Sequence, residues 1–298
     1  MADSIHPATA IGAVHLAVRD LERALAFYRE RLGFAVQRRE GNVAQLGAGG
    51  AALVVLVEEP DARTVRGTTG LYHFAVLLPS RPALAEVLRH LGRKNTPLHG
   101  ASDHRVSEAL YLADPEGNGI EIYRDRPRAE WPREGSRIAM ATDALDVDDL
   151  LAEPVPVPAS AGGDGALPPG TLIGHVHLRV ADIAAAEAFY CDVLGFDLTT
   201  RYGPSASFVS AGGYHHHIGF NTWAGQGAPP PPPDATGLRH FEVRLPDEAA
   251  RERVVERLRA AGAATSRVPT GLLVRDPSRN GILLTVAELT RGSSPASS

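Results

Sequence analysis

The chain has 298 residues, of which 44% are hydrophobic and 22% charged, and its formal net charge is −5. This composition is ordinary for a globular protein and excludes a disordered chain, a collagen-like repeat and a coiled coil. The negative charge argues against a nucleic-acid-binding protein, and no apolar run approaches the ~20 residues of a membrane helix. The single cysteine, Cys191, excludes an internal disulfide and a thiolate metal cluster. Because no secretory signal is visible either, we expect a cytoplasmic protein.

The first predicted elements are a strand, a helix and three further strands. Val14, Leu16 and Val18 alternate with other residues, which is typical of a strand. Asp20 is expected to cap a helix that Gly33 ends. Short apolar segments between glycines then predict strands over 36–39, 42–47 and 51–58. The same order follows in a strand over 71–78, a helix over 81–92 and strands near 97–99, 107–113 and 119–123.

The whole pattern repeats in the second half of the chain. Residues 11–34 and 173–196 are identical at 14 of 24 positions. Repeats of this kind indicate tandem copies, so we predict two domains of two β-α-β-β-β modules each. The predicted boundaries are 10–125 for the N-terminal domain (modules 11–58 and 70–125), 126–171 for a linker with a short helix near 142–152, 172–288 for the C-terminal domain (modules 172–222 and 237–288), and 289–298 for a disordered tail.

One such module has a single apolar sheet face and cannot stand alone. Paired modules can bury that face by closing their sheets around a shared concavity. The sequence H-x-x-L-x-V-x-D at 175–182, which runs into A-F-Y and L-G-F, resembles the vicinal oxygen chelate superfamily. That superfamily includes glyoxalase I, fosfomycin-resistance enzymes, bleomycin-binding proteins and type I extradiol dioxygenases. The resemblance implies an α+β fold in which mixed sheets close around a metal-binding cup.

The resemblance also implies where a metal would be held. One module supplies a ligand from its first strand, and its partner supplies one from its first strand and one from its last strand. The first-strand residues of modules 1 to 4 are Ala13, His73, His175 and His240, and the last-strand residues of modules 2 and 4 are Glu121 and Leu283.

Neither half therefore holds a complete ligand set. Pairing module 2 with module 3 assembles His73, Glu121 and His175, whereas module 1 with module 4 gives no site. Two imidazoles and one carboxylate leave open positions that suit non-haem Fe(II), with Mn(II) as the alternative metal. In a competing interpretation each half is self-contained and His15 is the third ligand. His177 repeats His15, which favours a shared strand role for both residues.

A longer motif precedes Glu121. The spacing from His104 through Tyr111, Asp114-Pro115-x-Gly117 and Glu121 resembles the extradiol dioxygenase signature, with Ser102 as one departure from it. By this resemblance His104 and Tyr111 would hydrogen-bond oxygens of the substrate near the metal. The corresponding positions in the second half are Ser266, Leu273 and Leu283.

A histidine run lies near the end of module 3, in the sequence Tyr214-His215-His216-His217. We expect it on the last strand, where alternation would turn His216 away from its two neighbours. Aligned on Ile218, His216 takes the place of the histidine that serves extradiol dioxygenases as acid and base. The alternative interpretation is a structural histidine cluster.

The order of these motifs is most similar to the two-domain catechol 2,3-dioxygenase subgroup. The implied activity is extradiol cleavage of a catechol by O2, next to its vicinal diol, to a 2-hydroxymuconic semialdehyde type of product in aromatic degradation. The alternatives are a glyoxalase-type isomerase, a thiol transferase, or a metal-free binding protein like those of bleomycin resistance. The predicted linker is long enough for modules 2 and 3 to meet within one chain or across a homodimer.

Overall fold

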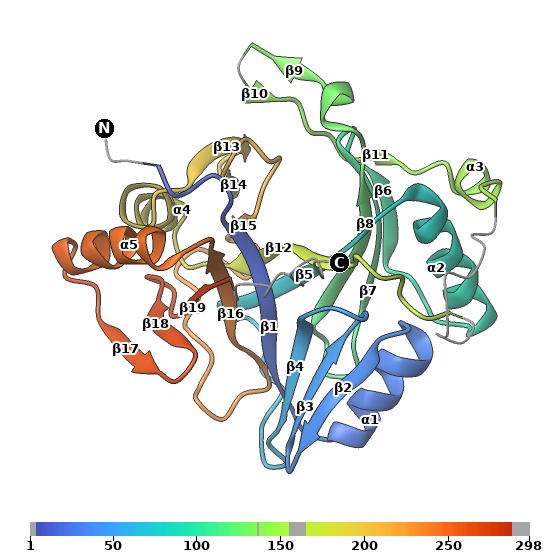
Figure 1. The fold of residues 1–298 in the computed structure, drawn as a ribbon, viewed down its shortest axis with the longest axis horizontal. Helices are drawn as coiled ribbons and strands as arrows, with labels where there is room; N and C mark the ends of the chain where they lie inside the picture. The colour runs from blue at the N-terminus through green and yellow to red at the C-terminus, as the bar shows by residue number, and fades with distance from the viewer. Residues whose placement is uncertain (1–3, 136, 155–164, 288–298) are drawn as a thin grey trace, which may run out of the picture.

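The computed structural model describes residues 4–135, 137–154 and 165–287. Four βαβββ modules follow one another along this part of the chain (Figure 1), which confirms the predicted α+β fold. The predicted tail over 289–298 lies outside the described residues. No helix in the described ranges is both long and apolar enough to cross a membrane.

The first half of the chain forms modules 1 and 2. Module 1 consists of β1 (Ala10–Val18), α1 (Leu21–Ala26), the π-helical turn η1 (Phe27–Arg31), β2 (Ala35–Glu40), β3 (Val43–Gly47) and β4 (Ala52–Glu58). The side chain of Asp20 accepts a hydrogen bond from the backbone N–H of Arg23, so it caps α1 as predicted. Module 2 consists of β5 (Gly70–Leu78), α2 (Arg81–Arg93), β6 (Gly100–Asp103), β7 (Ser107–Ala113) and β8 (Gly119–Asp125).

The second half forms modules 3 and 4 in the same order. Module 3 consists of β12 (Leu172–Arg179), α4 (Ile183–Glu187), the π-helical turn η3 (Ala188–Val193), β13 (Asp197–Tyr202), β14 (Ala206–Ser210) and β15 (Ile218–Asn221). Module 4 consists of β16 (Gly237–Leu245), α5 (Glu248–Ala260), β17 (Thr265–Val268), β18 (Gly271–Arg275) and β19 (Gly281–Val286).

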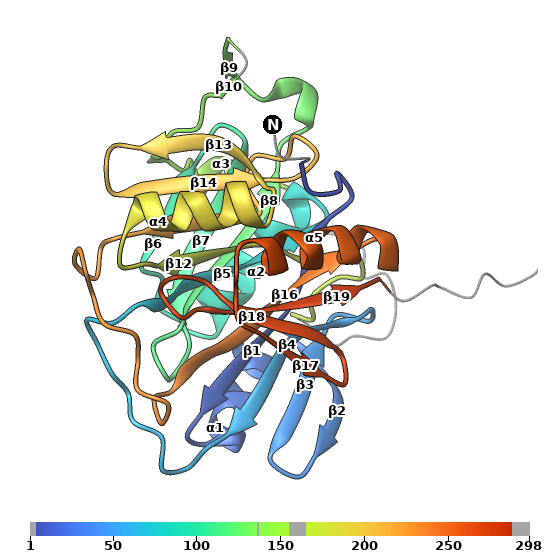
Figure 2. The same cartoon turned by 90° about the vertical axis from the view of Figure 1, so that its left-hand side faces the viewer.

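The modules pair across the two halves of the chain. One sheet has the order β11-β6-β7-β8-β5-β12-β15-β14-β13 and so joins modules 2 and 3, with β5 antiparallel to β12. The other has the order β17-β18-β19-β16-β1-β4-β3-β2 and joins modules 4 and 1. Figures 1 and 2 show the two curled sheets with helices on their outer sides. The predicted pairing of modules 2 and 3 is confirmed, and it takes place within one chain.

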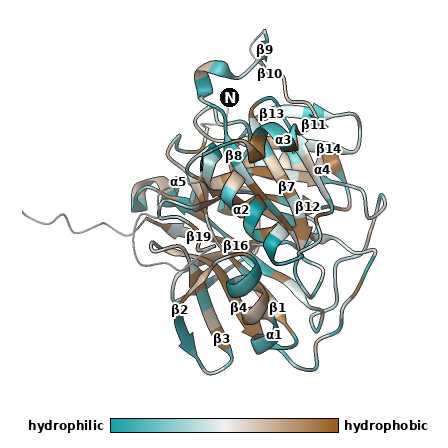
Figure 3. Ribbon diagram, turned by 90° about the vertical axis from the view of Figure 1, so that its right-hand side faces the viewer, coloured by the Kyte–Doolittle hydropathy of each residue, from teal (hydrophilic) through white to brown (hydrophobic). Residues whose placement is uncertain are grey.

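Buried apolar side chains from both sheets form one large core cluster. Figure 3 shows hydrophobic residues concentrated along the strands. Two equivalent buried hydrogen bonds tie the sheets together. Tyr28 donates to Asp114 and Tyr190 donates to Asp276, each with an oxygen–oxygen distance of 3.0 Å. Both bonds join a helix of one sheet to the Asp-Pro turn of the other, so the sequence repeat is also a repeat of the packing.

Within the segment predicted as a linker, the described residues 126–135, 137–154 and 165–171 are part of the fold. The segment contains η2 (Arg128–Glu130), β9 (Arg133–Glu134), β10 (Arg137–Ile138), β11 (Asp143–Ala144) and α3 (Val147–Leu151). β11 pairs with β6 and extends the edge of the sheet of modules 2 and 3. The guanidinium of Arg81 at the start of α2 donates to Glu108, Asp149 and Glu153, which holds α3 against that sheet. The predicted short helix is therefore present.

Candidate metal centre

Strand register brings the predicted ligands together on one face of the sheet of modules 2 and 3. Glu121 on β8 and His175 on β12 are both partners of Ala75, which lies between them on β5. His73 precedes Ala75 by two residues, so it projects from the same face. Because Ala75 is completely buried and has a small side chain, its longer neighbours can converge above it. Tyr111 on β7 pairs directly with Glu121 and continues the row.

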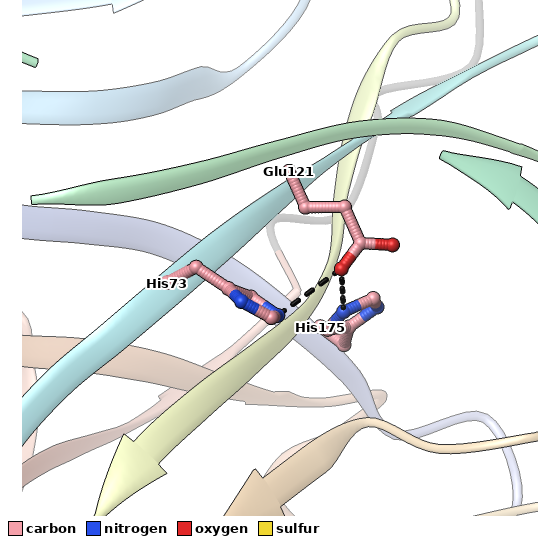
Figure 4. Close-up of side chains that lie close together, drawn as sticks. All are labelled: His73, Glu121 and His175. Carbon is pink, nitrogen blue, oxygen red and sulfur yellow. Dashed lines mark hydrogen bonds and ion pairs between the residues drawn. The ribbon is translucent and has the colours of Figure 1, made fainter. Parts of the chain in front are cut away.

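The side chains of the three predicted ligands meet at a single oxygen atom. The Nε2 atoms of His73 and His175 each lie 3.1 Å from Oε2 of Glu121 (Figure 4). One ligand atom from each residue lies within 4.8 Å of the others, and all three residues are buried. Burial lowers the pKa of His175 to about 4, partly opposed by the charge of Glu121, so this imidazole is neutral at neutral pH. A neutral imidazole is the form that binds a metal.

The donor set fits a divalent transition metal. Nε2 of His73 is buried and close to Glu121 but makes no hydrogen bond, and Nδ1 of His175 has no hydrogen-bond partner either. A buried polar atom without a partner is costly, and a cation among these side chains would satisfy the lone pair of His73. Two imidazoles and one carboxylate also match the ligand preferences of Fe(II) or Mn(II). A bound metal would therefore satisfy these polar atoms more completely than the contacts among the three side chains do.

A cavity of about 360 Å³ opens beside these ligands, and His73 and Glu121 line it. The two motif residues His104 and Tyr111 also line it, as does His216. The described structure therefore brings His73, Glu121, His104, Tyr111 and His216 to one cavity, with His175 directly behind His216 at a ring-centroid distance of 4.1 Å. Such a concave site with convergent polar groups is typical of a small-molecule site.

Backbone contacts from the predicted linker orient His104. Its Nδ1–H donates to the carbonyl oxygen of Ala141 at 2.6 Å, which leaves Nε2 as the acceptor of the hydroxyl of Tyr111, also at 2.6 Å. Burial, and then the nearby charge of Glu121, raises the pKa of Tyr111 well above its ordinary value, so its hydroxyl stays protonated. Met140, Ala141 and Thr142 line the cavity as well. The sequence pattern carries no signal for this contribution of the linker.

The histidine run is not on a strand, which corrects one prediction. Residues 211–217 form a turn through Gly212 and Gly213, whose φ values are +60° and +68°, and β15 begins only at Ile218. Strict alternation therefore does not apply. His215 and His216 are both buried next to each other, and His216 faces the cavity.

A chain of hydrogen bonds fixes the tautomer of His216. Asp125 accepts from Nε2–H of His215 at 2.9 Å, so Nδ1 of a neutral His215 is an acceptor. Nδ1 of His216 lies 2.9 Å from that atom, so when His215 is neutral it donates to it, and Nε2 of His216 then carries no proton. Burial, followed by the surrounding histidines, lowers the pKa of His216 well below its ordinary value. Neither Asp125 nor His215 was expected here, since Asp125 lies 90 residues before its partner.

His177 is a further cavity residue that the sequence interpretation missed. It pairs with His73 across β12 and β5. The carbonyl oxygen of the Asn221 side chain accepts from the backbone N–H of Trp223, so its amide nitrogen donates to Nε2 of His177 at 2.9 Å. Gly219 lies beside His177 on β15, where a Cβ would come within 3.2 Å of the imidazole. In the sequence, His177 repeats His15, and this repetition favoured a strand role for both residues. A repeat in the sequence does not show which surroundings each copy faces, so the cavity position of His177 was missed.

Among the residues that the structure describes, the equivalent cup of modules 1 and 4 holds no such ligand set. His15 stacks on His240 with ring centroids 4.0 Å apart, and its Nε2 lies 3.3 Å from Oε1 of Glu242. Ala13 and Leu283 occupy the other two ligand positions. His15 is on the other sheet from His73 and Glu121, so the interpretation with His15 as third ligand is wrong.

Comparisons with known proteins agree with this architecture. The model of the Glyoxalase/Bleomycin resistance protein/Dioxygenase superfamily matches residues 10–122 and 172–283. The chain is 46% identical over 280 residues to a catechol-2,3-dioxygenase of Bacillus subtilis (strain 168), which covers 92% of this chain and 96% of that enzyme.

Solved structures share the fold at low sequence identity. A protein from Bacillus subtilis subsp. subtilis str. 168 superimposes with a TM-score of 0.65 and 13% identity, covering 97% of this chain and 87% of that one. Glyoxalase I from Zea mays gives a TM-score of 0.57 and 15% identity, covering 93% and 92%. With the family match on both halves, and as the module pattern predicted, the chain belongs to the Glyoxalase/Bleomycin resistance protein/Dioxygenase superfamily.

Proposed function

We propose that the protein is an extradiol dioxygenase that cleaves the ring of a catechol next to its vicinal diol. The convergence of two imidazole nitrogens and one carboxylate oxygen beside a cavity of about 360 Å³ carries this proposal. The 46% identity to a catechol-2,3-dioxygenase supports the same enzyme class. In this reaction one ring C–C bond breaks and both atoms of O2 enter a 2-hydroxymuconic semialdehyde type of product.

In this proposal His73, Glu121 and His175 hold Fe(II), or alternatively Mn(II). When bound, such a metal supplies a redox-active centre with open positions for the diol oxygens and dioxygen. The protein holds the substrate in place. Tyr111 is the strand partner of Glu121 and its hydroxyl is oriented by His104, so we expect this pair to hydrogen-bond a diol oxygen. The residues that surround the diol thus fix its orientation before reaction.

His216 is the proposed acid–base residue. Its Nε2 carries no proton in the hydrogen-bond network described above, so it can accept one from a diol hydroxyl. Once protonated, the same atom can return the proton as the ring opens. Asp125 and His215 act on it only as positioning residues, because they do not line the cavity among the described residues.

The decisive experiment uses the first-strand histidines of modules 3 and 4, His175 and His240, which lie in different sheets. Oxygen uptake and the yellow absorbance of a ring-opened semialdehyde would be followed with catechol after anaerobic loading with Fe(II). We expect the wild type and His240→Ala to turn over, and His175→Ala to lose both iron and activity. A wild type that neither retains iron nor consumes oxygen with any catechol would overturn the proposal. Loss of activity in His240→Ala, with its fold intact, would contradict the assigned site.

A further inference from the structure

The equivalent cup of modules 1 and 4 opens into a second and larger cavity, of about 1420 Å³. Strands β1, β4, β16 and β19, one side of α5 and the turn between β17 and β18 line this cavity. Among the described residues, four arginines and three glutamates line it, whereas no lysine or arginine lines the cavity of about 360 Å³. The two cavities therefore suit ligands of different charge.

The charges of the larger cavity are not fully balanced. Each of its glutamates forms an ion pair with one of its arginines, in the pairs Glu242–Arg244, Glu248–Arg251 and Glu252–Arg259. The fourth arginine, Arg267, has no acidic partner among the described residues. The lining thus carries one excess positive charge in a chain whose formal net charge is −5. Such a local excess favours an anionic ligand.

Arg244 is the arginine best placed to hold an anion. Within the described part of the chain its guanidinium makes one contact, to Glu242, and this contact is 3.3 Å long, compared with about 2.7–2.9 Å for a typical charge-assisted hydrogen bond. Gly12 on the neighbouring strand leaves room for the guanidinium, since a Cβ there would come within 2.9 Å of Nη2. The planar fork of N–H donors therefore remains available to a carboxylate.

Thr285 adds a second donor beside Arg244. The two residues are strand partners on β19 and β16, and both line the cavity. The side chain of Thr285 is 8% exposed, and its Oγ1 has no hydrogen-bond partner among the described residues. A buried hydroxyl without a partner is costly, and an oxygen atom of a ligand held by Arg244 would satisfy it.

A flat surface lies next to this pair of donors. The imidazole of His15 lines the cavity and stacks on that of His240, with ring centroids 4.0 Å apart and 26° between the planes. Val55, the strand partner of His15, also lines the cavity. Glu242 contacts His15 through Oε1 and Arg244 through Oε2, so the imidazole and the guanidinium lie on either side of one carboxylate. This arrangement suits a planar molecule that covers His15 and reaches Arg244.

We propose that the cup of modules 1 and 4 is a second small-molecule site, which binds a planar organic carboxylate through Arg244 and Thr285. The rest of the ligand packs on His15. Aromatic acids have this chemistry, and so does the ring-opened, conjugated carboxylate that the proposed dioxygenase reaction forms. The site does not depend on that reaction, because none of its residues belongs to the proposed metal centre.

Isothermal titration calorimetry of the full-length protein with benzoate tests the proposal. We expect one benzoate per chain, with the same Kd in wild type and in His175→Ala. Both tryptophans lie on the side of the other sheet, since Trp223 lines the proposed active site and Trp131 contacts Tyr214. Tryptophan fluorescence should therefore stay constant as benzoate binds. Absence of binding, or binding that changes this fluorescence and is lost in His175→Ala, would overturn the proposal.

Two variants test the proposed donors. Arg244→Leu, which copies Leu77 at the corresponding position of module 2, should weaken benzoate binding about 30-fold. Thr285→Val should weaken it about 5-fold without lowering the urea midpoint, because the free protein loses no hydrogen bond. Arg253→Leu on α5 removes an exposed arginine that does not line the cavity, so it should keep the wild-type Kd. A wild-type Kd in Arg244→Leu and in Thr285→Val would contradict the proposal.

The charge of Glu242 provides a test in the opposite direction. Glu242→Gln removes a negative charge beside the ligand and releases Arg244, so benzoate should bind about 5-fold more tightly. A merely structural ion pair predicts no such gain, and weaker binding would contradict the assigned contact.

Other ligands define the chemical class and its source. Benzyl alcohol lacks the charge and inorganic phosphate lacks the plane, so each should bind at least about 10-fold more weakly than benzoate. Equal binding of either would overturn the assignment to planar carboxylates. The purified ring-opened product and benzoate would be titrated side by side, and the lower Kd identifies the source of the ligand. If the protein cleaves no catechol, the proposed function fails, whereas benzoate still decides on this site.

Discussion

His215 offers the sharpest test of the proposed acid–base residue, because it touches the cavity only through His216. Its side chain is 1% exposed and bridges Asp125 and His216 with two hydrogen bonds of 2.9 Å. His215→Leu keeps a similar volume but removes both bonds. Nδ1–H of His216 then has no acceptor, and the proton is free to move to Nε2, where it blocks the proposed base.

The expected loss follows from what a positioned acid–base group contributes. General acid–base catalysis accounts for about 10²–10⁴-fold in rate. We expect kcat of His215→Leu with catechol to fall about 100–1000-fold, or about 3–4 kcal/mol in activation free energy. The buried Nδ1–H of His216, left without a partner, should also cost about 1–3 kcal/mol of folding free energy, whereas Asp125 keeps the hydrogen bond from Tyr214. Iron content should remain that of wild type, since His215 is not a proposed ligand.

The control and the readout separate proton placement from general damage. The amide of His215→Gln can donate to Asp125 and accept from His216, so it should recover much of the lost kcat. ¹⁵N NMR of the metal-free protein should find the proton of His216 on Nδ1 in wild type and His215→Gln, and on Nε2 in His215→Leu. Wild-type kcat in His215→Leu, with the proton still on Nδ1, would refute the reasoning.

Three further predictions concern stability and metal binding. Tyr28→Phe and Tyr190→Phe should each lower the free energy of unfolding by about 1–2 kcal/mol in urea at an unchanged m value, because each removes one equivalent buried hydrogen bond; clearly unequal losses would contradict that equivalence. Arg81→Met should cost about 1–2 kcal/mol and raise KM for catechol, since α3 is no longer tied to the sheet; an unchanged KM would argue against a role of the linker in the site. Mn(II) at 100 times its Kd should stabilise the wild type and Glu242→Gln by about 2.7 kcal/mol in thermal unfolding, but not Glu121→Gln; equal stabilisation of Glu121→Gln would exclude Glu121 as a ligand.

The sequence predicted the four modules, and the family resemblance predicted how they pair. The 14 of 24 identities between 11–34 and 173–196 revealed the repeat, and alternation and capping then located most elements within a few residues. The pairing of modules 2 and 3 followed from the ligand positions that the resemblance to the vicinal oxygen chelate superfamily implies, because Ala13 and Leu283 cannot bind a metal. One strand was misplaced: β6 begins at Gly100 and not near 97, since Pro97 has no N–H to donate to a sheet ladder.

Most contacts around the proposed ligands could not be predicted from the sequence. Ala141 contributes a backbone carbonyl, an atom that every residue type has, so its role in orienting His104 leaves no trace in the sequence. Asp125 and His215 meet only because β8 and the turn before β15 lie together in space. The histidine run was assigned to a strand because it adjoins an apolar segment, yet the two preceding glycines with positive φ turn the chain there.

The nested pairing of the modules also sets an order of events during synthesis. Apart from the edge strand β11, the sheet of modules 2 and 3 is built from residues 70–125 and 172–221, so all its strands exist before module 4 is made. The other sheet needs β16 to pair with β1, and the paired residues Ala10 and Arg244 are 234 positions apart in the chain of 298 residues. Contacts at such separation form slowly, and chains fold from the N-terminus as they emerge. Of the four modules, module 1 is synthesised first and its partner, module 4, is synthesised last. Until β16 is available, one edge of β1 has no partner strand, and this edge can pair with a neighbouring copy of the chain.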